Sequence, residues 1–141
     1  MAKLSAAPIP PGKLTFKYSY DFAVDGGAVS TITMRSADGP LPNTFIVQEA
    51  FIDVIAGFTG AAGCTGAVST GQGAGDLVVA AIVAGAPFST TGPKVTIALL
   101  GTVATWIKMT AARSPTIAFA VNAATAGTLN LFIEGYLSAA S

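Results

Sequence analysis

Hydrophobic and polar residues alternate near the start of the chain. In KLTFKYSYDFAV, residues 13–24, apolar side chains occupy every second position and polar side chains fill most positions between them. A period of two is typical of a β-strand with one buried face. DGG at 25–27 then predicts a tight turn, and AVSTITMR at 28–35 predicts a second strand. Residues 14–35 are therefore predicted to form a β-hairpin.

Later segments carry similar strand signatures. Short runs rich in β-branched and aromatic residues are separated by Gly, Ser, Pro and Asn, which favours strands joined by turns. The Ala-rich run GDLVVAAIVAG is also compatible with a helical turn, but its valines and isoleucine favour a strand. The segments concerned are 44–55, 75–85, 93–101, 105–111, 115–122 and 126–137.

About nine closely spaced strands with turn-rich connections predict an all-β, antiparallel two-sheet sandwich, jelly-roll-like in its architecture. Before the first strand, three prolines disfavour helix and remove backbone donors. We therefore expect residues 1–13 to form an extended N-terminal arm and residues 14–141 to form a single β-sandwich domain. The arm is either a free tail or a segment that docks on a neighbouring subunit.

Few side chains carry a charge. Charged residues make up 10% of the 141 residues and hydrophobic residues 52%, whereas about 25% is the usual charged fraction. Seven basic and seven acidic residues leave no net charge, so there is no electrostatic basis for binding nucleic acid. With so little charge, either much of the surface consists of Gly, Ser and Thr or much of it is covered by other subunits. We expect both, and low net charge does not oppose such assembly.

No segment is predicted to cross a membrane or direct secretion. The most apolar run, 77–85, has about half of the roughly 20 residues that a spanning helix needs. The first 13 residues lack the apolar block of a secretory signal, so we expect synthesis in the cytoplasm and no membrane partner. Cys64 is the single cysteine and is expected to be a small buried residue.

Two carboxylates, Glu49 and Asp53, lie inside the apolar segment TFIVQEAFIDVIAGFTG at 44–60. On a strand they lie about 13 Å apart, at roughly 3.3 Å per residue, whereas paired glycosidase carboxylates lie about 5–9.5 Å apart. We therefore expect a partly solvated face and no acid/base pair. Four apolar residues share the parity of the acids, so both strand faces are apolar and the second is predicted to meet another subunit. The predicted oligomer interface residues are Phe45, Val47, Phe51 and Ile55.

Other catalytic and binding motifs are missing from the sequence. The chain has no histidine, which excludes Ser-His-Asp and Cys-His catalysis and most zinc sites. GQGAG at 71–75 and TGPK at 91–94 lack the spacing of nucleotide-binding loops. Asp76 is expected to cap the start of a strand, and Trp106 to pack in the interior or at an interface rather than stack on a sugar. The sequence predicts no catalytic residue, no cofactor and no metal site.

Two stretches resemble segments of small virion structural proteins of tailed bacteriophages: AFIDVIAGFTG at 50–60 and TAGTLNLFIEGYLS at 125–138. GDLVVAAIVAGAPF at 75–88 is similar to the Ala-rich middle of those proteins. Here Gly135 separates the acid from the tyrosine of the last strand, which predicts a bend or bulge. The resemblance implies a jelly-roll-like subunit, usually trimeric, that decorates or cements a capsid or forms part of a head or tail fibre.

The expected function is therefore that of a capsid decoration (cement) protein, which stabilises a bacteriophage capsid by oligomeric assembly without catalysis. Its expected partners are itself, as a homotrimer, and the major capsid protein, and its expected location is the capsid surface of the virion. The alternative is a tail or head fibre domain that binds host glycans, but the aromatic residues lie mainly inside strands, which favours decoration. The arm residues expected to contact the capsid are Leu4, Pro8, Ile9, Pro10 and Pro11.

Overall fold

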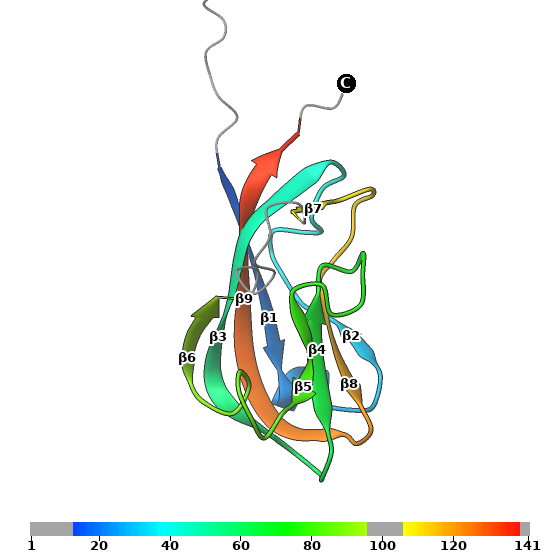
Figure 1. Ribbon diagram of the computed structural model, residues 1–141, viewed down its shortest axis with the longest axis vertical. Helices are drawn as coiled ribbons and strands as arrows, with labels where there is room; N and C mark the ends of the chain where they lie inside the picture. The colour runs from blue at the N-terminus through cyan, green and yellow to red at the C-terminus, as the bar shows by residue number, and fades with distance from the viewer. Residues whose placement is uncertain (1–12, 96–105, 139–141) are drawn as a thin grey trace, which may run out of the picture.

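The chain folds into two antiparallel β-sheets that pack face to face, as a computed structural model that describes residues 13–95 and 106–138 shows (Figure 1). Almost all regular structure is strand, with one four-residue helix, α1 (Phe22–Asp25), among the described residues. The strands are β1 (Leu14–Asp21), β2 (Thr31–Thr33), β3 (Phe45–Gly60), β4 (Thr65–Ser69), β5 (Val78–Ile82), β6 (Gly92–Val95), β7 (Ile107–Lys108), β8 (Thr116–Ala120) and β9 (Ala124–Leu137).

The strand order is that of a jelly roll. One sheet has the order β1-β9-β3-β6, with β7 also paired to β3, and the other has the order β2-β8-β4-β5. The antiparallel pairs β1–β9, β2–β8, β3–β6 and β4–β5 alternate between the two sheets. Such pairs form when one long ribbon of paired strands is wrapped around a common core. The predicted all-β two-sheet sandwich is confirmed.

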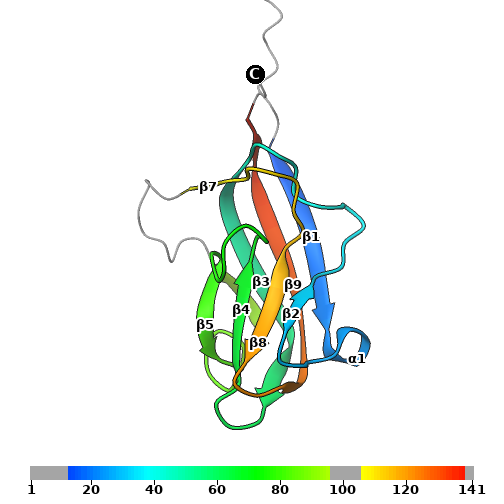
Figure 2. The same ribbon diagram turned by 90° about the vertical axis from the view of Figure 1, so that its right-hand side faces the viewer.

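The predicted hairpin of residues 14–35 is wrong. β1 ends at Asp21, whose carboxylate accepts a hydrogen bond from a backbone N–H of α1 and so caps that helical turn. The chain then crosses to the other sheet, where β2 pairs with β8 (Figure 2). One bridge between Ser19 and Arg35 joins the two segments. Apolar alternation identified both strands, but it is the same whether a turn returns the chain to its own sheet or leads it to the opposite one.

Other expectations from the strand pattern have mixed outcomes. The ambiguous run at 75–85 contains a strand, β5, as predicted. Residues 93–101 begin with β6 but lie partly outside the described residues, and 105–111 contains only the two-residue β7. The arm contacts predicted for Leu4, Pro8, Ile9, Pro10 and Pro11 lie outside the described residues.

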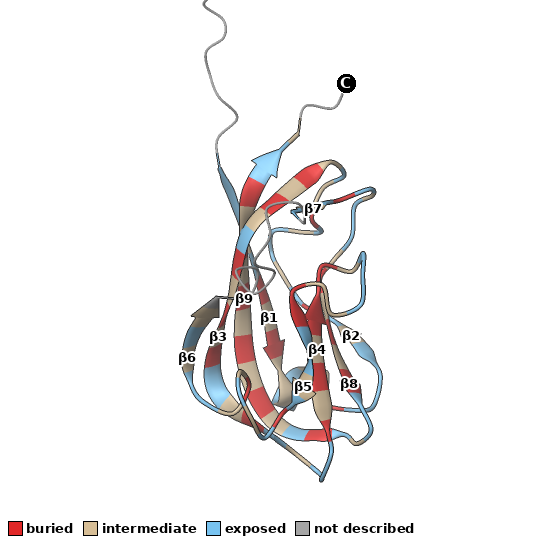
Figure 3. Cartoon of the chain, in the orientation of Figure 1, coloured by how far each residue is buried: buried red, intermediate tan, exposed pale blue. Residues whose placement is uncertain are grey.

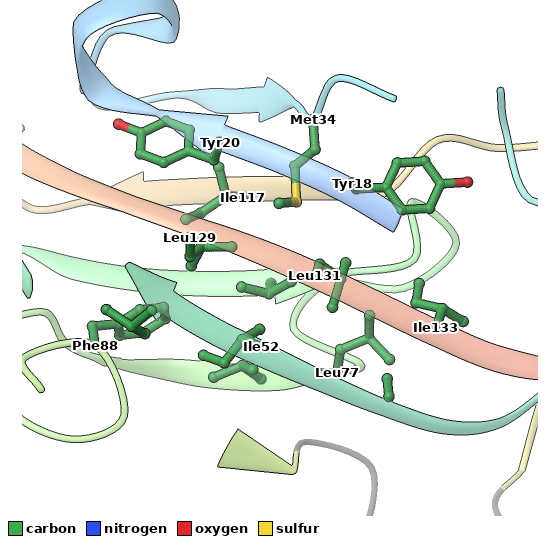
Figure 4. Close-up of a cluster of buried hydrophobic side chains, with 14 of the residues drawn as sticks. Tyr18, Tyr20, Met34, Ile52, Leu77, Phe88, Ile117, Leu129, Leu131 and Ile133 are labelled. Carbon is green, nitrogen blue, oxygen red and sulfur yellow. The ribbon is translucent and has the colours of Figure 1, made fainter. Parts of the chain in front are cut away.

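The core lies between the sheets, where the buried positions of both inner faces meet (Figure 3). Leu129, Leu131 and Ile133 of β9 are fully buried along its centre, with Ile52 on the neighbouring β3 and Ile117 on β8 of the other sheet (Figure 4). Burying a side chain of this size contributes about 1.5–3 kcal/mol to stability. The core therefore holds the two sheets together along the length of β9.

Tyrosines at the core satisfy their polar ends locally. The rings of Tyr18 and Tyr20 are buried, and their hydroxyls donate hydrogen bonds to the carbonyl oxygens of Gly39 and Gly26. Burial raises the pKa of Tyr20 to about 12 and also raises the pKa of Tyr18, so both hydroxyls stay protonated donors at neutral pH. Cys64 is buried, as predicted.

The long strand β3 changes its buried face within its length. Against β9, Val47 pairs with Gly135 and Glu49 pairs with Glu134, so Gln48 is one extra residue on β3. Such a β-bulge shifts every following side chain to the opposite face. The buried positions of β3 are Phe45 and Val47 before the bulge and Ala50, Ile52, Val54 and Phe58 after it.

This bulge corrects the predicted oligomer interface. Phe45 and Val47 are fully buried in the core, whereas Phe51 is half-buried and Ile55 is 51% exposed. The four residues therefore do not form one face. The prediction is wrong for Phe45 and Val47 because it assumed that side chains alternate regularly along the whole strand, whereas the bulge reverses the alternation. For Phe51 and Ile55 an interface role stays a prediction.

Gly135 lies opposite the bulge and allows the two strands to approach. A Cβ atom added at Gly135 would lie 1.9 Å from the carbonyl oxygen of Ile46. Glycine inside a strand commonly marks such a close backbone approach. The irregularity predicted at Gly135 is therefore present, but the extra residue is Gln48 on the partner strand β3.

Candidate interaction surfaces

The outer face of the five-stranded sheet carries two stacked aromatic rings at its centre. Phe51 of β3 lies opposite Phe132 of β9, with ring centroids 4.9 Å apart and planes inclined by 18°. Lys17 of β1 lies opposite Phe132 on the other side, its ammonium 5.9 Å from the ring centroid. Both rings are only half-buried in the single chain. An apolar patch, the Phe51–Phe132 pair, therefore remains accessible to a partner.

Acidic side chains lie on the same outer face. Glu49 is exposed and lies opposite Glu134 of β9, while Asp53 is half-buried and lies opposite Asn130. Lys13 Nζ lies 3.1 Å from Glu134 Oε1, and this hydrogen bond raises the pKa of Lys13. Glu49 and Asp53 are thus four residues apart on one strand and partly solvated, as predicted. Their arrangement supports no shared acid/base chemistry.

Neutral replacements of these acids are expected to have little effect. Glu49→Gln and Asp53→Asn should leave assembly and binding unchanged and should shift the free energy of unfolding by less than about 0.5 kcal/mol. Glu49→Gln removes a like-charge pair with Glu134, so its small effect is expected to be stabilising. Thermal unfolding and assays on candidate hydrolase substrates check both points. Loss of a measured activity in a folded variant would show that an acid takes part in chemistry.

The free edge of β5 is a second candidate surface. β5 is the last strand of the four-stranded sheet, and Val79 and Ile82 on it are 73% and 54% exposed. A groove of about 490 Å³ runs along it, lined by residues 75–81 together with Ala86, Pro87 and Lys94. The lining is mostly apolar and contains several alanines, so the groove suits small apolar side chains.

Asp76 closes the loop that leads into β5. Its Oδ1 accepts a hydrogen bond from the backbone N–H of Thr70 at 2.7 Å, and its Oδ2 accepts one from the Thr70 hydroxyl at 2.6 Å. The predicted strand cap is therefore wrong in detail, because Asp76 ties the end of β4 to the start of β5. Both carboxylate oxygens are used structurally.

A smaller polar cleft of about 250 Å³ lies over the outer face of the four-stranded sheet, with residues 71–75 on its rim. Gln72 fixes this rim: its amide donates to the carbonyl oxygen of Lys108 at 3.0 Å, and its side-chain oxygen accepts from the N–H of Thr110 at 2.8 Å. Trp106, two residues before Lys108, is 52% exposed. Interior packing predicted for Trp106 is therefore wrong, and packing at an interface stays a prediction.

Among residues 13–95 and 106–138, no three cysteine or acidic side chains gather in a group that could hold a metal ion. No helix there has the length and apolar character needed to cross a membrane.

The chain matches no known protein family and no curated protein sequence. Its fold is similar to that of a chain in a solved structure described as the Cyanophage Pam1 capsid asymmetric unit, with 22% identity and a TM-score of 0.63, covering 97% of this chain and 94% of that chain. It is also similar to a chain of the capsid of Ralstonia phage GP4, with 16% identity and a TM-score of 0.53, covering 99% and 92%.

At these identities the likeness establishes the fold. The protein is thus a jelly-roll sandwich with an apolar outer-face patch and an open sheet edge. Chains of two phage capsids share that fold over nearly their whole length. The predicted resemblance to phage virion structural proteins is confirmed at the level of the fold.

Proposed function

We propose that this chain is a structural protein of a bacteriophage virion that attaches to the outside of the capsid and reinforces it, without catalysis. The observation that carries the proposal is the extent of the shared fold. The likeness spans 97% and 99% of this chain and more than nine tenths of each capsid chain. The whole chain, not one motif, therefore has a counterpart in assembled phage shells.

An oligomer, specifically a homotrimer, is part of this proposal. A charged fraction of only 10% in the whole chain and the half-buried Phe51–Phe132 pair favour cover by another subunit. On the outer face, Lys17 lies on the edge strand β1 whereas Glu49 and Asp53 lie towards the other edge, on β3. Unlike charges at opposite sides suit head-to-tail contacts, which close into rings such as trimers.

Reinforcement follows from binding the assembled shell. A protein that binds the assembled state and not the separated subunits stabilises that state by mass action. A trimer that contacts several neighbouring shell subunits at once also gains from multivalency, since each further contact forms at high effective concentration. The major capsid protein is the proposed partner, and the proposed location is the capsid surface after synthesis in the host cytoplasm.

The N-terminal arm, residues 1–13, is proposed to help fasten the protein to a neighbouring subunit in the shell. Its prolines restrict the chain to extended conformations, so less conformational entropy is lost when the arm is immobilised. Leu4 and Ile9 provide apolar contacts, and Pro8, Pro10 and Pro11 need no backbone hydrogen-bond acceptors.

Deletion of residues 2–12 is expected to weaken attachment to undecorated capsids by at least tenfold, because the arm's contacts are lost. Co-sedimentation with naked capsids and capsid melting temperature measure this effect. A variant in which 2–12 is replaced by a Gly/Ser segment of equal length is the control, and it should behave like the deletion. Full attachment and full heat protection by the deletion variant would show that the arm is only a tail.

A second candidate function is a head or tail fibre domain that binds host glycans. The observation that favours it is the half-exposed Trp106, which lies close in sequence to the rim-fixing contact of the polar cleft. Aromatic faces exposed beside polar groups suit sugars. A full-length protein that never binds capsids, yet binds a glycan and loses that binding on Trp106→Ala, would establish this function instead.

A further inference from the structure

The four outer edges of the sandwich are not equally protected against strand addition. The edge strand β1 is covered: Ser19 exchanges both backbone hydrogen bonds with Arg35, and the N–H of Lys17 donates to Asp38 Oδ2 at 3.0 Å. β2 has three residues, and β6 carries Pro93 and Lys94. Short strands, proline and charge are the usual devices that prevent edge pairing. Three edges therefore have a recognisable guard.

Among residues 13–95 and 106–138, the edge of β5 has none of these guards. Its sequence, VVAAI, contains neither a charge nor a proline, and Val79 and Ile82 expose most of their surface. Such an edge is a template for another chain, since it offers backbone donors and acceptors along one side. The adjoining groove of about 490 Å³ adds an apolar, alanine-lined wall. Peptides that add a strand to a sheet use both features: backbone hydrogen bonds for affinity and shallow pockets for alternate side chains.

We infer that β5 receives the N-terminal arm of a neighbouring copy of this chain as an added strand. Within the arm, residues 3–7, KLSAA, contain no proline and equal β5 in length. Apart from Lys3 and Leu4 they are small, which suits a shallow groove. The prolines that follow at positions 8, 10 and 11 limit strand pairing to this segment. The inference rests on the proposed function, and it names the partner of the arm and the surface on that partner to which the arm binds.

The position of β1, which follows the arm in the sequence, favours a neighbouring copy over the same chain as the acceptor. The arm leads into β1, and β1 and β2 form one side of the sandwich, whereas β5 lies at the opposite side (Figure 2). Residues 8–13, which link the pairing segment to β1, span at most about 25 Å when fully extended, and in their own chain they would have to pass around the sandwich to bring that segment to β5. In a head-to-tail ring the β1 side of one copy faces the β5 side of the next, so the arm meets the groove directly.

An edge variant tests the surface. Val79→Lys places a charge on an exposed position, so the fold should be kept while strand addition is opposed. Val121→Lys, at a position 70% exposed in the turn between β8 and β9, is the matched control. For the isolated protein, light scattering over a dilution series should show the oligomer's dissociation constant raised at least tenfold by Val79→Lys and unchanged by Val121→Lys. Equal behaviour of the two variants would overturn the inference.

Cross-linking tests the occupant. In a Leu4→Cys/Val79→Cys variant, a short bismaleimide is expected to join chains into covalent oligomers, and mixing the two single variants should give covalent dimers. Wild-type protein is the control, because Cys64 is buried. The inference would be overturned if cross-linking gave only intrachain products or no products. It would also be overturned if the Val79→Lys protein formed normal oligomers and cross-links but no longer bound capsids. Interchain cross-links in a protein that never binds capsids would leave the inference standing and contradict the proposed function.

Discussion

Gly135→Ala is expected to lower the free energy of unfolding by at least about 3 kcal/mol and the melting temperature by on the order of 10 °C. The added Cβ would lie 1.9 Å from the carbonyl oxygen of Ile46. That oxygen belongs to the backbone of β3 just before its bulge, and on the far side of β3 the two-residue strand β7 pairs with Ile46 and Val47. The carbonyl cannot move away without disturbing β7, so relief requires separating β3 from β9.

Gly73→Ala is the matched control for this substitution. The nearest neighbour of a Cβ at Gly73 would be Asp76 Oδ2, at 3.5 Å, which is an ordinary contact. The control should therefore change stability by less than about 0.5 kcal/mol. Both variants are compared with wild type by thermal unfolding at one protein concentration, because oligomerisation makes the melting temperature depend on concentration. A Gly135→Ala protein with the wild-type melting temperature would contradict the close strand approach.

Phe51→Asp is expected to dissociate the oligomer, with a dissociation constant raised at least about a hundredfold. Phe51 stacks on Phe132 and is half-buried in the single chain, and a partner that covers the pair would exclude the remaining water. A carboxylate at this position would then be buried without a counter-charge, which costs several kcal/mol. Glu49 lies two residues before this position on β3 and Asp53 two residues after it, so both carboxylates would repel the new charge.

Size exclusion with light scattering at micromolar concentration measures this effect, and circular dichroism establishes whether the variant is folded. Val121→Asp places the same charge at a position 70% exposed in the turn between β8 and β9, and should leave the oligomer intact. Phe51→Leu keeps the site apolar and should also preserve assembly. A wild-type protein that is a stable monomer, or a Phe51→Asp oligomer of unchanged stability, would show that this face is open to water.

Strand alternation predicted the fold class because it reports directly on burial. β9 shows this most clearly: Leu129, Leu131 and Ile133 are buried and the residues between them face outward. The Ala-rich run that became β5 was also identified, through its β-branched residues. Each of these signals is local, so it requires no knowledge of which strand lies alongside.

The candidate interface was only half predictable, and the reason is a single residue. Counting parity along β3 grouped Phe45 with Phe51, but the bulge at Gln48 sends the first into the core and leaves the second on the outer face. A bulge has no reliable sequence signature on the strand that contains it. Gly135 was a correct signal of an irregularity in this place, although it lies on the partner strand.

The sequence by itself determined an all-β sandwich with no histidine and with only 10% charged residues. Only the tertiary structure decided that β1 pairs with β9 and β2 with β8, which half of β3 faces the core, and that β5 ends its sheet without a guard. Periodicity and composition are properties of a single segment, and they indicate which of its residues are buried. Pairing, register and edge position depend on contacts between residues that can lie more than a hundred positions apart, such as Leu14 and Gly135. The free energy gained from such a contact must exceed the entropy cost of closing the loop between its residues, and no single segment encodes that balance.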